Sequence, residues 1–391
     1  MRKVYLDNAA TTRMHEEVFA AMKPYLLEHY GNPSSIHSFG RQARKAVEDA
    51  REQVAAALGA EPREIVFTSG ATEANNLAIR GIARAQKNKG NHLITSAVEH
   101  HAVLDTCKAL AKEGFTVTVV PVDEYGMVDP AAVEAAITDQ TILVSIMLAN
   151  NEVGTINPIA EIGEICRKHN LIFHSDAVQG IGNIPVNVDN LKVDLLSLSA
   201  HKFYGPKGIG ALYVRKGTKL DVFNFGGVQE RKLRPGTENV PAIVGLGKAI
   251  ELATSDLEAE AAKLRVLRDK LIKGLLAIEA TKLNGHPEKR LPGNVNVSIQ
   301  YIEGESLLLS LDLKGVAASS GSACTSGSLD PSHVLMAMGL DHQTAHGSLR
   351  LTLGRDNTEE DVDYVLEVLP EIVERLRAMS PIYTGNEIKR S

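Results

Sequence analysis

The chain has 391 residues, of which 44% are hydrophobic and 23% charged, and its formal net charge is -6. Because this length exceeds the roughly 250–300 residues that one hydrophobic core organises, we expect two domains. The acidic balance excludes a general attraction to nucleic acid or anionic membranes, and the longest apolar run, ILVSIMLA, is too short to span a bilayer. The first residues, MRKVYLDNAATT, lack the apolar core of a signal peptide, so we expect a cytoplasmic protein.

Seven short apolar runs between residues 65 and 214 predict strands. In chain order they are IVFT, HLITS, TVTVVPV, TILVSIML, LIFHSDA, DLLSLSA and GIGALYV. Amphipathic helical segments, such as EANNLAIRGIARAQ and IAEIGEICRKHN, separate the earlier runs. This alternation predicts an α/β fold with a seven-stranded, mostly parallel sheet, because parallel neighbours need a long crossover connection.

The order of the predicted elements changes after residue 256. Ser255 and Asp256 are plausible N-caps of a long amphipathic helix that begins at Leu257. The strand NVNVSIQ, the helix ESLLLSLDLKG, a Ser/Gly-rich loop, the strand LRLTLGR and a final helix opened by NTEEDVDYV follow it. We therefore expect a large domain at residues 15–256 and a smaller α+β domain formed by residues 1–14 and 257–391.

The three cysteines are widely spaced, and no CxxC pair suggests a metal site or a redox dithiol. Cys107 and Cys166 lie in helical patterns, where a cysteine is usually a small buried apolar residue. Cys324 differs, because it lies in SSGSACTSGS, a stretch that can bury little. We expect this stretch to belong to a mobile surface loop at about residues 316–330.

Polar residues follow several of the predicted strands, at the edge where open α/β sheets bind their ligands. Residues 69–72 come after IVFT and open a helix, whose free backbone N–H groups are suited to a phosphate. After HLITS, His100 or His101 offers an aromatic ring that can cover a flat ligand. Asn150 and Asn151 follow TILVSIML, and Asn150 is interpreted as an ordinary loop residue.

Two charged residues complete this edge. Asp176 ends a run that should form a central strand, with Gln179 three residues later, and a buried carboxylate there needs a cationic partner or a proton. Lys202 follows DLLSLSA, where its amine is available for covalent chemistry. A lysine, a carboxylate, an aromatic ring and a phosphate-binding loop together match what pyridoxal phosphate requires, whereas no complete Rossmann or Walker motif is present.

Ten motifs of the chain resemble the cysteine desulfurases of the nitrogen-fixation and iron–sulfur-cluster-assembly type. They are YLDNAATT, GNPSSIHSFG, TSGATEANN, VEHHAVL, ANNEVGT, HSDAVQ, SAHKFYGPKGIGALYV, RPGTENVP, SSGSACTSGSL and AHGSLRLTLGR. The resemblance covers essentially the whole chain. It implies the class V aminotransferase-like branch of the fold type I enzymes, with pyridoxal 5'-phosphate as the cofactor.

The resemblance also implies which residues hold the cofactor. Lys202 would form the Schiff base, Asp176 would face the pyridine nitrogen, and Gln179 would face the ring hydroxyl. His100, preferred over its neighbour, would stack on the ring and move a proton on or off the substrate thiol. The implied phosphate ligands are Ala71, Thr72, Ser199, His201 and, from a neighbouring subunit, Thr237.

Three further roles follow from the resemblance. Arg350, helped by Asn151, would bind the substrate carboxylate, while its rival Arg355 is interpreted as half of a surface ion pair. Cys324 would be the nucleophile that carries a persulfide. The contribution of Thr237 across subunits implies a homodimer with shared active sites.

The expected activity is therefore conversion of L-cysteine to L-alanine, with transfer of the sulfane sulfur first to Cys324 and then to an acceptor protein. The acceptor could be an iron–sulfur scaffold, a nitrogenase-maturation scaffold or a tRNA-thiolation protein. One alternative is another fold type I enzyme, such as a selenocysteine lyase. An alternative of another class is a non-catalytic sulfur carrier or scaffold, which Lys202, Asp176 and His100 argue against.

Overall fold

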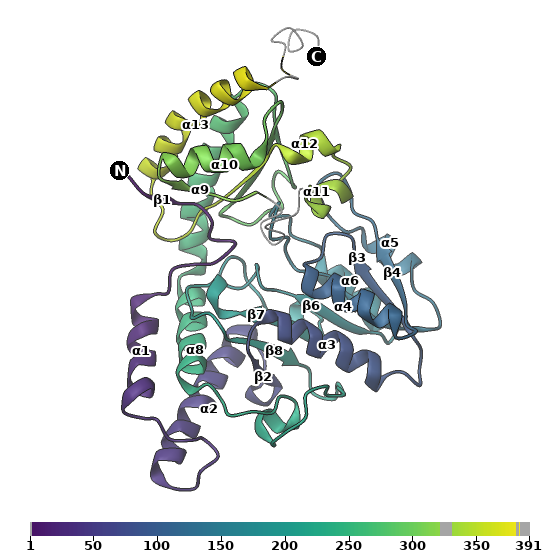
Figure 1. The fold of residues 1–391 in the computed structure, drawn as a ribbon. Helices are drawn as coiled ribbons and strands as arrows, with labels where there is room; N and C mark the ends of the chain where they lie inside the picture. The colour runs from purple at the N-terminus through teal and green to yellow at the C-terminus, as the bar shows by residue number, and fades with distance from the viewer. Residues whose placement is uncertain (1, 321–330, 381–382, 384–391) are drawn as a thin grey trace.

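The computed structural model describes residues 2–320, 331–380 and 383. Its largest sheet has seven strands in the order β2-β8-β7-β6-β5-β3-β4 (Figure 1). The strands are β2 (Ile65–Thr68), β3 (His92–Ser96), β4 (Thr116–Val120), β5 (Thr141–Ser145), β6 (Ile172–Asp176), β7 (Leu195–Ser199) and β8 (Gly210–Val214). All neighbouring strands are parallel except the two pairs made by β8. The predicted α/β class and the seven predicted strands are confirmed.

Helices cover both faces of this sheet. The helices of this part are α1 (Glu16–Leu27), α2 (Ser38–Leu58), α3 (Ala71–Ala85), α4 (His101–Lys112), α5 (Pro130–Ala135), α6 (Ile159–Lys168), α7 (Val188–Leu191) and α8 (Val240–Ser255). Short 3-10 turns lie at Pro62–Glu64, Ala200–Lys202 and Gln229–Lys232.

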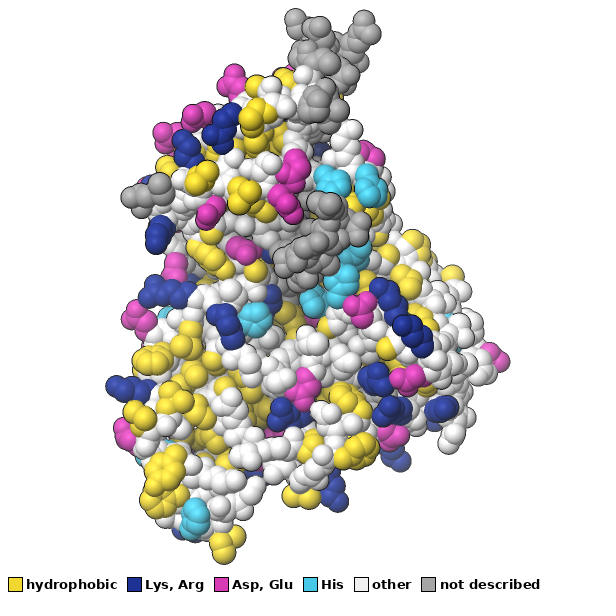
Figure 2. All heavy atoms as spheres, viewed as in Figure 1, with side chains coloured by type: hydrophobic (Ala, Val, Ile, Leu, Met, Phe, Trp, Pro, Cys, Tyr) yellow, Lys and Arg dark blue, Asp and Glu magenta, His cyan; other side chains and the backbone are white. Residues whose placement is uncertain are grey.

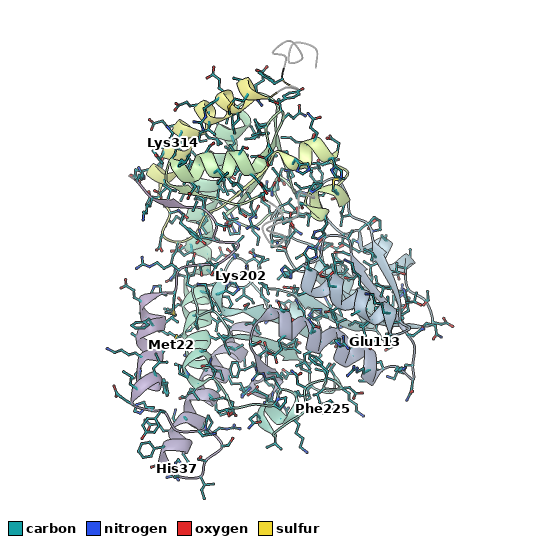
Figure 3. The ribbon with its side chains drawn as sticks, viewed as in Figure 1. Met22, His37, Glu113, Lys202, Phe225 and Lys314 are labelled. Carbon is teal, nitrogen blue, oxygen red and sulfur yellow. The ribbon has the colours of Figure 1, made fainter. Side chains whose placement is uncertain are left out.

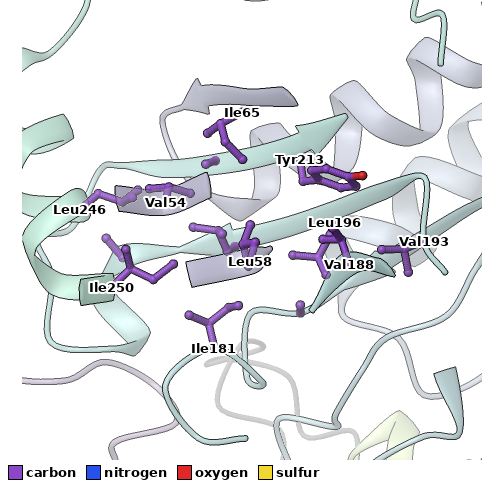
Figure 4. Packing of buried hydrophobic residues seen from close by; sticks show 14 of the residues in the cluster. Val54, Leu58, Ile65, Ile181, Val188, Val193, Leu196, Tyr213, Leu246 and Ile250 are labelled. Atoms are coloured by element: carbon purple, nitrogen blue, oxygen red, sulfur yellow. The ribbon is translucent and has the colours of Figure 1, made fainter. Parts of the chain in front are cut away.

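Alternating strand residues pack on opposite faces of the sheet, as the two-residue period of a strand requires. Ile65 and Phe67 belong to the hydrophobic cluster that includes α2, α6 and α8, whereas Val66 belongs to the cluster of α3 and α4. Figure 4 shows the first cluster, with Leu58 and Ile250 close to the strand residues. Burial on both faces explains why the strands other than the edge strand β4 are mostly apolar in sequence.

A second group of smaller sheets lies above the first in Figure 1. Its strands are β1 (Val4–Tyr5), β9 (Thr281–Leu283), β10 (Asn294–Ile299), β11 (Val316–Ala317) and β12 (Ser348–Thr352). β12, β10 and β9 form an antiparallel sheet, while β1 and β11 form a parallel pair. The helices of this part are α9 (Leu257–Leu276), α10 (Gly304–Leu313), α11 (His333–Ala337), α12 (His342–His346) and α13 (Glu359–Met379).

We infer that the two parts are domains at residues 15–256 and at 1–14 with 257–391. One hydrophobic cluster joins residues 4–6 to residues of α9, β10, β12 and α13, and it is separate from the clusters on the seven-stranded sheet. The parallel pairing of β1 with β11 ties the start of the chain to the second part. Among the described residues, no helix is both long and apolar enough to cross a bilayer.

Two local expectations need correction. Ser255 ends α8 instead of capping α9, and Asp256, the residue before α9, makes no capping hydrogen bond with its side chain. The reason is that α8 and α9 follow each other with Asp256 alone between them. Val316 and Ala317, expected at the start of the Ser/Gly loop, form β11 instead, because their backbone pairs with β1.

Candidate active site

One cavity of about 600 Å³ contains most of the predicted site residues. Figure 3 shows Lys202 between the seven-stranded sheet and the smaller sheets. The predicted residues that line this cavity are Ala71, Thr72, His100, Asn151, Asp176, Gln179, Ser199, His201, Lys202 and Arg350. Except for Arg350 in β12, they follow or end strands of the large sheet or open the helices behind them. The carboxyl edge of the sheet is therefore the floor of the cavity.

The start of α3 forms one end of the cavity. Gly70 precedes the helix with φ +155°, a backbone conformation that favours glycine, and supplies no side-chain cap. Uncapped N–H groups at the start of a 15-residue helix are a favourable site for an anion. Ser199 and His201 line the same cavity and add polar groups.

Asp176 lies at the end of β6 and is buried. Its Oδ2 accepts a hydrogen bond from Asn75 Nδ2 at 2.6 Å, and its Oδ1 accepts one from Val178 N at 3.0 Å. The sequence predicted a cationic partner or a proton, whereas these contacts come from neutral donors. Gln179 Nε2 donates to Ala9 O at 2.9 Å, which brings the N-terminal segment to the cavity.

Lys202 ends the 3-10 turn that follows β7. Its Nζ donates to Ala9 O at 2.6 Å and to Ala10 O at 2.7 Å. The neighbouring His201 has a pKa lowered to about 4 by burial and by the positive charges of Lys202 and Lys207. Its ring is therefore neutral at physiological pH.

His100 is the N-cap of α4, and its Nδ1 accepts a hydrogen bond from Ala102 N at 3.1 Å. Because Nδ1 is an acceptor, the neutral ring carries its proton on Nε2. Burial lowers the pKa of His100, as does the charge of Lys202, while Asp176 acts in the opposite direction. His101 does not line the cavity, and its ring lies 4.8 Å from that of His333.

Arg350 reaches the cavity from β12 and is buried. Its Nη1 donates to Asn151 O at 3.1 Å, and its Nη2 donates to Asp7 Oδ1 at 2.9 Å. Arg355 does not line the cavity. The surface ion pair expected for Arg355 is not found among the described residues; instead its guanidinium lies over the ring of Tyr204, 4.7 Å from the centroid, which is a cation–π contact.

Three residues have other surroundings. Asn150 is structural, because its buried side chain bonds to the backbone of Val98, Glu152 and Val153. Thr237 does not line this cavity but a separate one of about 240 Å³, which also contacts Ser69 and Gly208. Cys324 lies outside the described residues.

Sequence reasoning missed Asn75, Asp7 and the carbonyl groups of Ala9 and Ala10. Asn75 carried a usable signal, because it lies one helical turn after Ala71 and so can face the same edge of the sheet. The other three belong to YLDNAATT, which was noted as a motif without a role. Their distance along the chain from Lys202 and Arg350 left no local pattern to read.

The residues present fit pyridoxal phosphate. The uncapped start of α3 suits its phosphate, Lys202 its aldehyde, Asp176 its pyridine nitrogen and His100 the face of its ring. A cavity of about 600 Å³ also leaves room for an amino acid beside the cofactor. Asn75, whose Nδ2 donates to Asp176, has a buried Oδ1 without a hydrogen-bond partner among the described residues.

Comparisons with known proteins agree with this geometry. The family model described as Aminotransferase class-V matches residues 4–365. A cysteine desulfurase IscS of Methanosarcina thermophila is 61% identical over 381 residues, which are 97% of this chain and 94% of that protein.

Two solved structures are also similar. A NifS-like protein has a TM-score of 0.91 at 43% identity and covers 96% of this chain and 100% of its own. The structure of SspA in complex with cysteine has a TM-score of 0.81 at 39% identity and covers 90% of this chain and 99% of its own. This chain therefore belongs to the class-V aminotransferase family and, within it, to the pyridoxal-phosphate-dependent cysteine desulfurases.

Proposed function

We propose that this chain removes the sulfur of free L-cysteine, releases L-alanine and carries the sulfur on Cys324 as a persulfide. One observation carries the proposal. Lys202, Asp176 and His100 from the large sheet and Arg350 from β12 line a single cavity, in a member of the cysteine desulfurases. The SspA structure with bound cysteine supports L-cysteine as the substrate.

Each cavity residue has a role in this proposal. Lys202 would hold the cofactor covalently, Asp176 and Gln179 would hold its ring, and its phosphate would be held by Ala71, Thr72, Ser199 and His201. When bound, pyridoxal phosphate draws electrons away from the substrate Cα. Once the amine of L-cysteine has displaced Lys202 from the cofactor, the freed Nζ would take the proton from that carbon, close to the carbonyl groups of Ala9 and Ala10 to which it donates.

The substrate is held at its other groups by Arg350 and His100. Arg350, next to Asn151, binds the substrate carboxylate with a charge-assisted hydrogen bond. His100 directs the proton on its Nε2 toward the substrate sulfur, because its Nδ1 is occupied by the Ala102 N–H.

Cys324 supplies the thiolate that attacks the substrate sulfur. An S–S bond forms, the C–S bond of the substrate breaks, and the electron pair remains with the carbon skeleton, which takes up protons to become alanine. The other two cysteines are unsuited to this step, because burial raises the pKa of Cys107 and of Cys166 to about 12.

The active form is proposed to be a homodimer. Large hydrophobic side chains are exposed along α1, the start of α2 and the segment between them: Phe19, Leu26, Leu27, Tyr30, Ile36 and Phe39. Figure 2 shows hydrophobic side chains gathered at the lower left of the molecule, where α1 and α2 lie in Figure 1. Thr237, which does not line the cavity of about 600 Å³ in its own subunit, would bind the cofactor phosphate of the second subunit.

The destination of the sulfur is proposed to be iron–sulfur cluster assembly in the cytoplasm. The name IscS of the 61% identical relative supports this choice over nitrogenase maturation and tRNA thiolation. The acceptor is then a scaffold protein that takes the persulfide sulfur from Cys324.

The proposed roles of Lys202 and Cys324 are tested by Lys202→Ala and Cys324→Ala in the cofactor-loaded protein. Lys202→Ala is expected to lose both the absorbance of the lysine-bound cofactor and the release of alanine from L-cysteine. Cys324→Ala is expected to keep that absorbance and its response to L-cysteine but to release alanine at least about 100-fold more slowly, because the nucleophile is absent.

Cys166→Ala is the matched control, since it removes a thiol that the proposal does not use, and it is expected to keep the parental rate. Release of alanine by Cys324→Ala at the parental rate would show that another group takes the sulfur.

A further inference from the structure

Asp7 of the motif YLDNAATT has no role in the proposed function, although the segment that contains it connects the two parts of the molecule. Residues 4–5 pair with β11, and Leu6 O accepts from Thr352 N of β12 at 2.7 Å. Thr12 N then donates to His201 O at 2.9 Å, beside Lys202. One short segment therefore contacts both the strand that bears Arg350 and the turn that bears Lys202.

Asp7 is the charged residue of this segment, and its contact with Arg350 is direct. Asp7 Oδ1 accepts from Arg350 Nη2 at 2.9 Å, and the exposed fractions of the two side chains are 21% and 4%. The backbone of Asp7 bridges to Thr352, two residues after Arg350 on the same strand. The backbone of Asp7 is thus attached to β12, the same strand that carries Arg350.

Arg350 needs such a partner because it is a buried cation at the wall of a cavity. Its second anchor, Asn151 O, is a neutral carbonyl and contacts a different nitrogen, Nη1. Hydrogen bonds from two different nitrogens fix the plane of a guanidinium. A single hydrogen bond would leave the group free to rotate. Among the described residues, Glu152 also interacts electrostatically with Arg350, but its buried side chain accepts a hydrogen bond from Ser332 Oγ.

We propose that Asp7 is the positioning residue for Arg350, holding its guanidinium at the cavity wall so that the carboxylate of the amino acid substrate can bind there. The inference rests on the proposed role of Arg350 in binding that carboxylate. Asp7 itself does not line the cavity. Its removal therefore weakens binding of ligands that have a carboxylate and leaves other amines unaffected.

The test compares two amines that react with the same cofactor but differ in the carboxylate. The cofactor-loaded protein is titrated with L-alanine and, separately, with ethylamine, and the change in cofactor absorbance gives each dissociation constant. Asp7→Asn is expected to raise the constant for L-alanine about tenfold, the typical effect of losing one charge-assisted hydrogen bond, and to leave ethylamine unchanged.

Two controls accompany this variant. Asp363→Asn breaks an ion pair with Lys270 between α13 and α9, away from the cavity, and is expected to change neither constant. Asp7→Ser removes the same charge with a smaller side chain and is expected to reproduce the selective loss if Asp7→Asn does not fold.

A double variant separates this proposal from the proposed role of Arg350. If Asp7 acts through Arg350, Asp7→Asn adds nothing to the weakened binding of L-alanine by Arg350→Lys, because interacting residues are not additive. If Arg350→Lys weakens L-alanine but Asp7→Asn does not, or weakens ethylamine equally, the role of Asp7 is refuted. If Arg350→Lys itself leaves L-alanine unchanged, the carboxylate site is elsewhere and both ideas are refuted.

Discussion

His174 is a titratable side chain that is fully buried in the middle of the seven-stranded sheet. Its Nδ1 lies 2.8 Å from Ser145 Oγ of β5, and its Nε2 lies 3.0 Å from Ser197 Oγ of β7. Burial lowers the pKa of His174 to about 3. The ring is therefore neutral in the folded protein, and the two hydroxyl groups satisfy both of its nitrogens.

This residue predicts a loss of stability in mild acid. Below about pH 6.5 the unfolded chain binds a proton at His174 that the folded chain refuses until about pH 3, so protonation favours unfolding. Between these values His174 alone should remove ~1.4 kcal/mol of unfolding free energy per pH unit. Urea unfolding from pH 6.5 to 4 measures this slope, and His174→Gln, whose amide can still bond to the serines, should reduce it by that amount. Equal slopes for the two proteins would contradict the prediction.

Most of the cavity residues that the sequence predicted lie at or shortly after the end of an apolar strand, and Arg350, within β12, is the exception. Lys202 and Asp176 were found in this way, because the carboxyl edge of a parallel sheet is a known place for ligands. This rule does not identify Asn75 and Asp7, because their importance comes from contacts with Asp176 and Arg350, which are far away in the sequence. The Asp7–Arg350 contact spans 343 positions.

At the level of elements, the strands of the large sheet could be predicted from the sequence more readily than those of the small sheets. Each strand from β2 to β8 has an apolar or β-branched run at its position, and all of them except the edge strand β4 are buried on both faces. The antiparallel direction of β8 has no signal in its own residues, since direction depends on the connection that precedes it. β1 and β11 are two residues each, too short for any periodic pattern, and form because they pair with each other.

The exposed side chains of α1, α2 and their connection predict a subunit interface. Ile36, between these helices, is 91% exposed, and Leu27 at the end of α1 is 75% exposed. The double variant Leu27→Asp/Ile36→Asp should raise the dissociation constant of the dimer at least about tenfold, because it places two charges in an apolar contact. Sedimentation equilibrium measures this constant. Leu309→Asp, at a 67% exposed position on α10, is the control and should sediment as the parent does.

Two outcomes would contradict the interface. The parental protein could sediment as a single chain, or the double variant could associate as tightly as the parent. When the variant and the parent are compared in the same oligomeric state, their thermal unfolding temperatures should be similar. The reason is that the side chains of Leu27 and Ile36 are mostly exposed in their own subunit.

At the scale of the whole molecule, the cavity exists because the N-terminal segment and β12 meet at the edge of the large sheet. The segment 5–12 lies beside Lys202, and β12 places Arg350 opposite the strand ends. The sequence predicted the two parts and most of the lining residues, but not how the first residues join them. That arrangement depends on backbone pairing between distant segments, which has no local sequence pattern.

The most direct test is the location of the sulfur after the cofactor-loaded protein meets one equivalent of L-cysteine without reductant. Mass spectrometry of the peptides should find one added sulfur atom on the peptide that contains Cys324, matched by one alanine released. The peptides of Cys107 and Cys166 should be unchanged, and Lys202→Ala should show no added sulfur. Sulfur on either buried cysteine, or on Cys324 in the Lys202→Ala variant, would contradict a cycle in which Lys202 and Cys324 act together.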